Sequence, residues 1–190
     1  MTLNTIFFIG PQGSGKGTQA KMLAQKLDFF YWEMGGILRE VAASQSELGK
    51  KVKALIDSGT LLKDEDLYEV VKVRLNQIPK TKGVIFDGIP RRIGQAQFLL
   101  DYLKQQGRTD FSTLYVSLPK EESVNRLLNR AKLEKRPDDT IEKIDFRLQQ
   151  YAEETVPVLE FLENNTIFFE IDGTPKVEDV TKKINEVLGI

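Results

Sequence analysis

The sequence predicts a single α/β domain built on a five-stranded parallel sheet with helices on both faces. Short apolar runs rich in β-branched and aromatic residues alternate along the chain with longer segments of helical periodicity. Strands separated by helices pair in parallel, because each helix carries the chain back to the end of the sheet where the next strand begins. A chain of 190 residues is long enough to bury the core of such a sheet.

The first apolar run, residues 5–9, leads directly into a glycine-rich turn, and a helical pattern follows. The turn reads Gly10-Pro11-Gln12-Gly13-Ser14-Gly15-Lys16-Gly17-Thr18. Glycines let consecutive N–H groups surround a polyphosphate, the next helix N-terminus attracts anions, and a lysine adds a positive charge. The turn therefore predicts a phosphate-binding P-loop and the P-loop NTPase fold, although Gly17 stands where most P-loops carry Ser or Thr. A glycine-rich turn without a ligand is the alternative.

Four further strand-like runs complete the expected sheet, at residues 29–32, 84–86, 111–118 and 166–171. Helical spacing of apolar residues marks the segments between them. Two such sets are Ala20, Leu23, Ala24 and Leu27, and Leu48, Val52, Leu55 and Ile56.

Polar residues and one proline predict where the later helices begin or bend. Asp64 is expected to cap a helix that continues past residue 70. Asp139 with Glu142 has the spacing of a capping box, which predicts a long helix through Tyr151. Pro157 is expected to kink or break that helix, because proline lacks an N–H and its ring clashes with the preceding turn.

The composition excludes several kinds of chemistry. The chain has no cysteine and no histidine, which rules out a thiol nucleophile, a Cys/His zinc site and a histidine base. Its net charge is −1, so no overall basic field predicts nucleic-acid binding. No apolar stretch has the length of a membrane span, and we expect no membrane partner and a cytoplasmic location. Phosphoryl transfer remains, because it depends on positioning and charge neutralisation rather than a strong base.

The run at residues 84–86 ends in an acid, Asp87, which is followed by Gly88. In a P-loop protein, an aspartate in this position holds Mg²⁺ or its water shell. An isolated aspartate at a strand end is more often a turn former, but the P-loop favours the metal interpretation. No Glu follows Asp87 to activate water, and no Asn-Lys-x-Asp motif reads guanine. These features favour transfer to a substrate rather than to water.

The segment after the second motif resembles the adenylate kinases and their nucleoside-monophosphate kinase relatives. Those proteins carry Asp-Gly-x-Pro-Arg with a glutamine four residues later, and their P-loops have Gly between Lys and Thr. Here the matching residues are Asp87-Gly88-Ile89-Pro90-Arg91 with Gln95, and Lys16-Gly17-Thr18. The likeness extends from Ile6 to about Leu188, and Asp172-Gly173-Thr174 resembles the family's loop beside the ATP base.

The resemblance implies one adenylate kinase-like domain over residues 1–190. Its core comprises residues 1–32, 63–129 and 137–190, a helical NMP-binding segment covers 33–62, and a short lid covers 130–136. The implied reaction is reversible, Mg²⁺-dependent transfer of a phosphoryl group from ATP to AMP, which gives two ADP and serves nucleotide biosynthesis. The enzyme is expected to act as a cytoplasmic monomer with ATP and AMP as its small-molecule partners.

The resemblance also assigns site residues. Those with catalytic roles are Lys16, Arg91, Arg126, Arg136 and Arg147. Those that bind ATP are Gly13, Ser14, Gly15, Lys16, Gly17, Thr18, Arg126, Arg130 and Pro175. Those that bind AMP are Met34, Gly35, Arg39, Thr60, Leu61, Leu62, Gly88, Ile89, Pro90, Arg91, Gln95, Arg136 and Arg147, with Gln95 reading the base. Asp87 holds Mg²⁺ through the water shell of the ion. Arginine suits these roles because its forked donors match phosphate oxygens.

Two positions depart from the family pattern before Arg39. Met34 replaces a small hydroxyl residue near the acceptor base, which leaves UMP, CMP or another monophosphate open as the acceptor. Gly36 replaces an aspartate that helps to order the water shell of Mg²⁺, and Glu33 is the nearest acid that could compensate. A nucleotide-binding relative that has lost catalysis is the remaining alternative.

Overall fold

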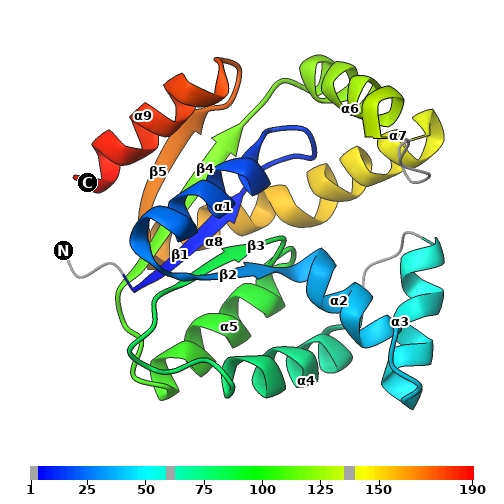
Figure 1. Ribbon diagram of the computed structural model, residues 1–190, viewed down its shortest axis with the longest axis vertical. Coiled ribbons are helices and arrows are strands. Elements are labelled where there is room, and N and C mark those ends of the chain that lie inside the picture. The colour runs from blue at the N-terminus through cyan, green and yellow to red at the C-terminus, as the bar shows by residue number, and fades with distance from the viewer. Residues whose placement is uncertain (1–3, 59–62, 135–139) are drawn as a thin grey trace.

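The computed structural model describes residues 4–58, 63–134 and 140–190. Figure 1 shows strands and helices alternating along the chain, as the sequence predicted. The strands are β1 (Thr5–Ile9), β2 (Phe30–Glu33), β3 (Val84–Asp87), β4 (Phe111–Ser117) and β5 (Ile167–Asp172). The helices are α1 (Lys16–Leu27), α2 (Met34–Ala42), α3 (Glu47–Ser58), α4 (Asp64–Leu75), α5 (Ile93–Gln105), α6 (Lys120–Glu134), α7 (Ile141–Gln150), α8 (Val156–Asn165) and α9 (Val177–Leu188).

The five strands form one sheet in the order β2-β3-β1-β4-β5, and every pairing is parallel. The predicted five-stranded parallel α/β fold is therefore confirmed. The chain adds β2 and β3 on one side of β1 and then β4 and β5 on the other. The carboxyl end of β1 lies at this change of direction, which is where open α/β sheets bind their ligands.

Alternation of side chains along the strands gives each face of the sheet its own core. Phe7 points to one face and stacks on Phe86 at 5.2 Å between ring centroids, and Phe86 in turn packs against Trp32 at 5.3 Å. The register explains this row, because Phe7 pairs with Phe86 and Trp32 pairs with Phe86 in adjacent strands. Ile6 and Phe8 point to the opposite face and belong to a separate apolar cluster.

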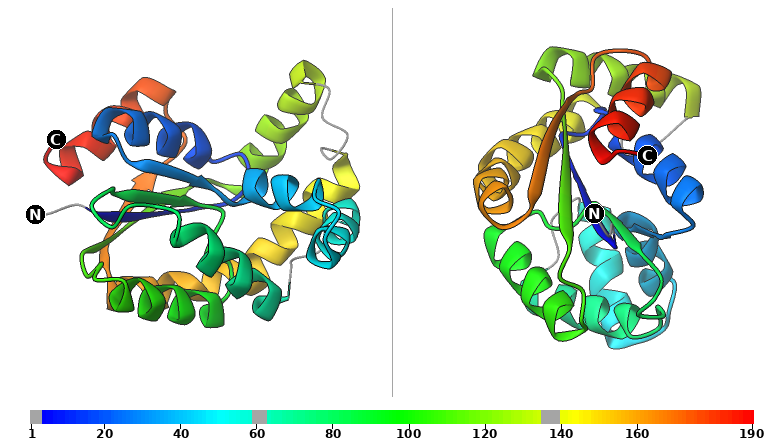
Figure 2. Two further views of the ribbon diagram at one scale, coloured as in Figure 1. Left: turned by 60° about the horizontal axis from the view of Figure 1, so that its bottom comes forward. Right: turned by 90° about the vertical axis from the view of Figure 1, so that its left-hand side faces the viewer.

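Helices cover both faces, as the view along the sheet in Figure 2 shows. Helices α1 and α9 supply apolar residues to the cluster around Ile6 and Phe8, while α4 and α5 supply theirs to the cluster around Phe7. Helix α8 packs on β4, β5 and α5. The start of β1 and the C-terminus lie at one end of the molecule, and α2, α3, α6 and α7 lie at the other, where the strands have their carboxyl ends (Figures 1 and 2).

Two predicted helix caps are wrong. Helix α4 begins at Asp64 itself, with Lys63 in the capping position, and the Asp64 carboxylate bonds to Gln95 and Arg92 instead of its own helix. For α7 the cap is Thr140, whose Oγ1 accepts a bond from the N–H of Lys143 at 3.4 Å. Asp139, which we expected in that role, lies outside the described residues.

The predicted disturbance at Pro157 is confirmed. Between α7 and α8 the chain forms a π-helical turn over Tyr151–Thr155, and Pro157 occupies the first turn of α8. Proline is tolerated there, because N–H groups in a first turn have no partner within the helix. A π-turn of this kind reorients side chains, and the one here borders the pocket described next.

Among the described residues, no helix is both long enough and apolar enough to cross a lipid bilayer.

Candidate functional site

The P-loop connects the end of β1 to the start of α1, in the centre of the sheet. Gly13 and Gly15 have φ angles of 86° and 84°, in the left-handed region that glycine adopts without strain. A Cβ on Gly10 would lie 2.4 Å from the carbonyl oxygen of Val116, so only glycine allows the loop to lie against β4. Gly15 occupies the capping position of α1 and has no side chain to fill it. The first N–H groups of α1 are thus left to an anion.

Lys16 is the first residue of α1, and its ammonium lies among charged groups. Its Nζ donates to the carbonyl oxygen of Pro11 at 3.2 Å. Burial lowers the pKa of Lys16; the nearby Asp87 opposes this shift, and the positive charges of Arg91, Arg130 and Arg147 add to it. Lys16 is partly buried and lines the pocket described below. A cation held among other cations binds polyanions strongly.

Asp87 ends β3 directly beside the P-loop. Its Oδ2 accepts a hydrogen bond of 2.9 Å from the hydroxyl of Tyr31 on β2, which also lies 3.4 Å from the carbonyl oxygen of Gly17. Burial and the Asp87 carboxylate raise the pKa of Tyr31, so this hydroxyl stays protonated and donates. Sequence reasoning missed Tyr31, whose role depends on the pairing of β2 with β3.

The same contact explains why glycine follows the lysine. A Cβ on Gly17 would lie 3.0 Å from Oδ2 of Asp87 and 3.7 Å from the hydroxyl of Tyr31. The departure from the common P-loop pattern thus makes room for the carboxylate. A Ser or Thr at this position would displace the acid that we expect to bind the metal shell.

We predict that Gly17→Ala separates stability from nucleotide binding. Alanine favours a helix over glycine by about 0.5–1 kcal/mol, so the thermal midpoint should stay level or rise. The new Cβ forces Asp87 to move, and we expect affinity for MgATP to fall by about tenfold, the loss typical of one charge-assisted contact. Isothermal titration with MgATP and a thermal melt test both effects. Unchanged MgATP affinity would show that the close approach has no functional consequence.

A pocket joins the P-loop to the residues after β3 and to the π-turn. Its lining residues are Phe8, Ile9, Gly10, Gln12, Lys16, Gly88, Pro90, Arg91, Arg147, Gln150, Tyr151 and Thr155. The structure thus brings together Lys16, Gly88, Pro90, Arg91 and Arg147 from the predicted site. Gln12, Gln150 and Thr155 were not predicted; of these only Gln12 had a signal in the sequence, its place inside the P-loop.

Arg91 is held in this pocket through its backbone and its side chain. Its Nε donates to the carbonyl oxygen of Gly88 at 3.0 Å, and its own carbonyl oxygen accepts from Oγ1 of Thr155 at 3.2 Å. Its N–H donates to Oε1 of Gln95 at 2.9 Å. Burial lowers the pKa of Arg91, with Asp87 opposing the shift and Arg147 adding to it. The guanidinium is positioned before any ligand arrives.

Arg126 lies outside the pocket lining and faces the loop after β5. Its Nη1 and Nη2 donate to the carbonyl oxygens of Gly173 and Thr174, each at 2.9 Å, and its Nε donates to Glu122 at 2.7 Å. It therefore joins α6 to the loop that we expect beside the ATP base. Pro175, also predicted to bind ATP, follows this loop and is exposed. Arg130 lies close enough to Lys16 to lower the pKa of the lysine.

The segment after β2 holds the predicted acceptor residues Met34, Gly35 and Arg39. Met34 is 3% exposed, belongs to the core cluster around Trp32, and accepts a bond from the indole Nε1 of Trp32 through its sulfur at 3.3 Å. Its side chain therefore packs into the core. Arg39 forms an ion pair of 2.8 Å with Glu33, and both side chains are substantially exposed.

Glu33 also lies against Gly36. A Cβ on Gly36 would be 3.2 Å from Oε2 of Glu33, so the carboxylate of residue 33 occupies the space beside the position where the family carries an aspartate. Four predicted residues, Thr60, Leu61, Leu62 and Arg136, lie outside the described part of the chain. The other predicted positions belong to elements at the carboxyl edge: Gly13, Ser14 and Thr18 in and after the P-loop, and Ile89, buried, after β3.

Comparison with known proteins identifies relatives along almost the whole chain. The family model described as "Adenylate kinase" matches residues 8–167. A protein named adenylate kinase from Thermus thermophilus is 37% identical over 185 residues, 97% of each chain. The one from a Cyanothece species is 39% identical over 96% of this chain and 94% of its own, and the one from Archaeoglobus fulgidus is 33% identical over 96% and 97%.

Proposed function

This chain belongs to the adenylate kinase family, and on that basis we propose that it transfers the γ-phosphoryl group of ATP to AMP, giving two ADP in a reversible reaction. The transferred group moves directly: an oxygen of the AMP phosphate attacks the γ-phosphorus, and the bond to the β–γ bridging oxygen breaks as ADP leaves. A covalent enzyme intermediate is not required, in keeping with a chain that has neither cysteine nor histidine.

The observation that carries the proposal is the convergence of positive charge on one pocket. Lys16, Arg91 and Arg147 line it, and Arg130 lies close enough to shift the pKa of Lys16. Arg91, Arg130 and Arg147 each disfavour the charged form of Lys16, and Asp87 opposes them, so the lysine is subject to repulsion from its cationic neighbours. Two nucleotides that bring several phosphate charges would remove that repulsion, and the same cations would stabilise the charge on the group in transit.

The pocket also suggests how the two nucleotides are divided. The P-loop and the first turn of α1 supply N–H groups for the β- and γ-phosphates of ATP, with Lys16 between them. Gly88, Pro90 and Arg91 line the same pocket and suit the acceptor phosphate. The positive charge of Arg147 adds to the lowering of the pKa of Arg91, and both residues line the pocket, so we propose that they act on the same phosphoryl group.

Mg²⁺ is part of the proposal, and the acids present fit it. Within the described residues, no three Asp, Glu, Cys or His side chains are grouped to hold a metal ion by themselves. Magnesium in nucleotide sites is typically bound by one carboxylate, water and the phosphates, which is what Asp87 beside the P-loop offers. When bound, the ion would neutralise charge on the β- and γ-phosphates. Tyr31 keeps the Asp87 carboxylate turned toward Gly17.

The acceptor is proposed to be AMP in spite of Met34. That residue raised the possibility of another base preference, but its buried sulfur bonds to Trp32, so it does not present a new side chain to a base. Gln95 remains the proposed reader of adenine. Glu33, which lies against Gly36, is proposed to supply the carboxylate that the family carries at residue 36.

The test is turnover with different acceptors. Purified protein is given MgATP with AMP, CMP, UMP or GMP, and nucleoside diphosphates are separated and quantified. We expect rapid ADP formation with AMP alone, dependence on Mg²⁺, and no activity in a Lys16→Met preparation, which controls for contaminating kinases. Faster turnover with CMP or UMP than with AMP would show that the acceptor is a pyrimidine nucleotide and not AMP. Binding of ATP without transfer to any acceptor would contradict the proposal.

We further propose that the enzyme acts as a monomer in the cytoplasm. In support of the monomer, one chain by itself supplies Lys16, Arg91 and Arg147 to the pocket. Sedimentation velocity across a range of protein concentrations tests the monomer, and fractionation of cells tests the location. A dimer that is more active than the diluted monomer would contradict the first part.

A further inference from the structure

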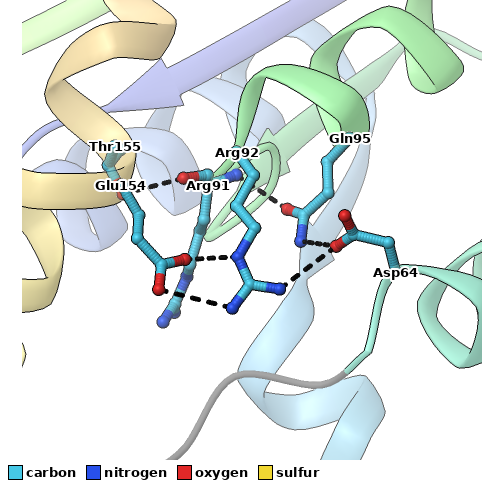
Figure 3. A network of polar contacts seen from close by, with 6 residues as sticks. All are labelled: Asp64, Arg91, Arg92, Gln95, Glu154 and Thr155. Atoms are coloured by element: carbon cyan, nitrogen blue, oxygen red, sulfur yellow. Dashed lines mark hydrogen bonds and ion pairs between the residues drawn. The ribbon is translucent and has the colours of Figure 1, made fainter.

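Gln95 is buried at the start of α5 and is held from two sides (Figure 3). Its Oε1 accepts a bond of 2.9 Å from the backbone N–H of Arg91. Its Nε2 donates a bond of 2.8 Å to Oδ1 of Asp64, the first residue of α4. One contact thus comes from the segment after β3, and the other from the helix that follows the proposed NMP-binding segment.

These partners allow only one orientation of the amide. A backbone N–H can only donate, and an ionised carboxylate can only accept. If the amide turned by 180°, its NH₂ would face the N–H of Arg91 and its oxygen would face the carboxylate of Asp64. Both contacts would then be repulsive. The positions of the amide oxygen and nitrogen of Gln95 are therefore fixed by the chemistry of the neighbouring groups.

A fixed amide distinguishes bases that a freely turning amide would treat alike. Adenine carries an amino donor at position 6 next to an acceptor at N1, whereas guanine carries an acceptor at O6 next to a donor at N1. A glutamine with one free N–H and one free oxygen lone pair matches either pattern if it turns over. With its orientation fixed, it matches only one of them.

We propose that Asp64 is a positioning residue for acceptor specificity: by fixing the amide of Gln95, it makes the site prefer a 6-aminopurine over a 6-oxopurine monophosphate. The inference rests on the proposed function, in which Gln95 contacts the base. Asp64 itself does not touch the substrate. Its effect is on which atom of Gln95 is presented, so its loss changes the choice between acceptors more than the rate with AMP.

Asp64 is in turn held by Arg92. Nη1 of Arg92 lies 3.4 Å from Oδ1 of Asp64, and Nε and Nη2 of the same guanidinium bond to Glu154 in the π-turn. Figure 3 shows Arg92 between the two acids. The hydrogen bond to Glu154 raises the pKa of Arg92, and both acids add to that shift, so the arginine stays charged. Arg92 thus holds the Asp64 carboxylate in place.

The test is the isosteric substitution Asp64→Asn. An asparagine accepts or donates equally well, so it tolerates both orientations of Gln95 and removes one of the two constraints. We expect the ratio of kcat/KM for AMP to that for GMP to fall by about tenfold, the effect of losing one hydrogen bond to a charged group. Most of the change should come from a lower KM for GMP, with kcat for AMP almost unaltered. Equilibrium dialysis should show the same gain in GMP binding without turnover.

Two matched variants separate this effect from a general loss of charge. Glu65→Gln removes a carboxylate from the same first turn of α4, where residue 65 is exposed. Glu154→Gln removes the charge of a second carboxylate that bonds to Arg92, and this carboxylate does not bond to Gln95. Both should keep the AMP to GMP ratio of the unmodified protein.

Each outcome decides the inference. A reduced ratio in Asp64→Asn alone supports it. An unchanged ratio, or equal losses with all acceptors, overturns it while leaving the proposed function intact. The same reduction of the ratio in Glu154→Gln also overturns it, because the ion pair between Arg92 and Glu154, rather than the bond between Gln95 and Asp64, would then set the choice of acceptor. If the unmodified protein does not phosphorylate AMP at all, the proposed function fails first and the inference fails with it.

Discussion

Lys16→Met is expected to abolish phosphoryl transfer while making the free protein more stable. Lys16 is the charged residue in the first turn of α1, whose N–H groups we propose bind phosphate. Removing one preorganised stabiliser of transition-state charge costs about 10²–10³ in rate, and we expect a loss of at least this size. Methionine keeps most of the length and apolar volume of the lysine side chain.

The gain in stability follows from the lowered pKa of Lys16. Burial and three neighbouring arginines disfavour its charged form in the folded protein relative to the unfolded chain. Folding at neutral pH therefore works against this charge, and its removal should raise the thermal midpoint. A lysine with a lowered folded-state pKa carries its full penalty below that pKa. This penalty disappears as the pH rises from the folded-state pKa to the unfolded-state pKa of lysine. The stabilities of the unmodified protein and of Lys16→Met should therefore converge at alkaline pH.

ADP formation and thermal melts at several pH values test both parts. The melts are run without nucleotide, because ATP stabilises only a protein that binds it. A midpoint lower than that of the unmodified protein would show that Lys16 stabilises the fold through its bond to the carbonyl oxygen of Pro11. If Lys16→Met kept a transfer activity within tenfold of that of the unmodified protein, the catalytic role proposed for Lys16 would be wrong.

Arg91→Lys is expected to lose nearly as much activity as Arg91→Met. The guanidinium of Arg91 has Nε committed to the carbonyl oxygen of Gly88, which leaves its terminal nitrogens to form paired bonds with a phosphate. An ammonium keeps the charge but lacks both the bond to Gly88 and the forked geometry. We expect kcat/KM for AMP to fall by roughly 10²–10³ in both variants, as for the loss of one preorganised donor.

Steady-state kinetics with AMP as the varied substrate measures this, and titration with MgATP alone serves as the control. MgATP affinity should change little, because we propose that Arg91 binds the acceptor phosphate rather than ATP. Recovery of most of the activity by lysine would mean that charge alone matters. A loss confined to MgATP binding would assign Arg91 to the donor nucleotide.

Much of the fold could be read from local patterns. Each predicted strand lies within one or two residues of an observed one. Runs such as residues 84–86 are buried on both faces, so they contain only apolar residues and are easily recognised as strands. The P-loop was equally local, since its glycines and Lys16 are consecutive. The helix caps predicted at Asp64 and Asp139 were wrong. A polar residue near a helix start has a choice of partners, and at residue 64 the choice was made by α5, far away in the sequence.

The order of the strands and the partners of the polar side chains were decided by the tertiary structure. Parallel pairing of β2 with β3 places Tyr31 on Asp87, and the same approach of β3 to the P-loop explains the glycine at residue 17. Met34 shows the limit most clearly. Its identity suggested a change in the acceptor site, but packing turned its sulfur toward Trp32.

By itself, the sequence determined the α/β class, the P-loop motif and the presence of arginines at motif positions, because each depends on residues close together in the chain. Only the tertiary structure decided which groups share one pocket and which are already committed to protein partners. Arg91 and Arg147 line the pocket, whereas Arg126 bonds to the loop after β5. The reason is physical: a hydrogen bond or a pKa shift depends on distance in space, and distance in space is set by packing across the sheet.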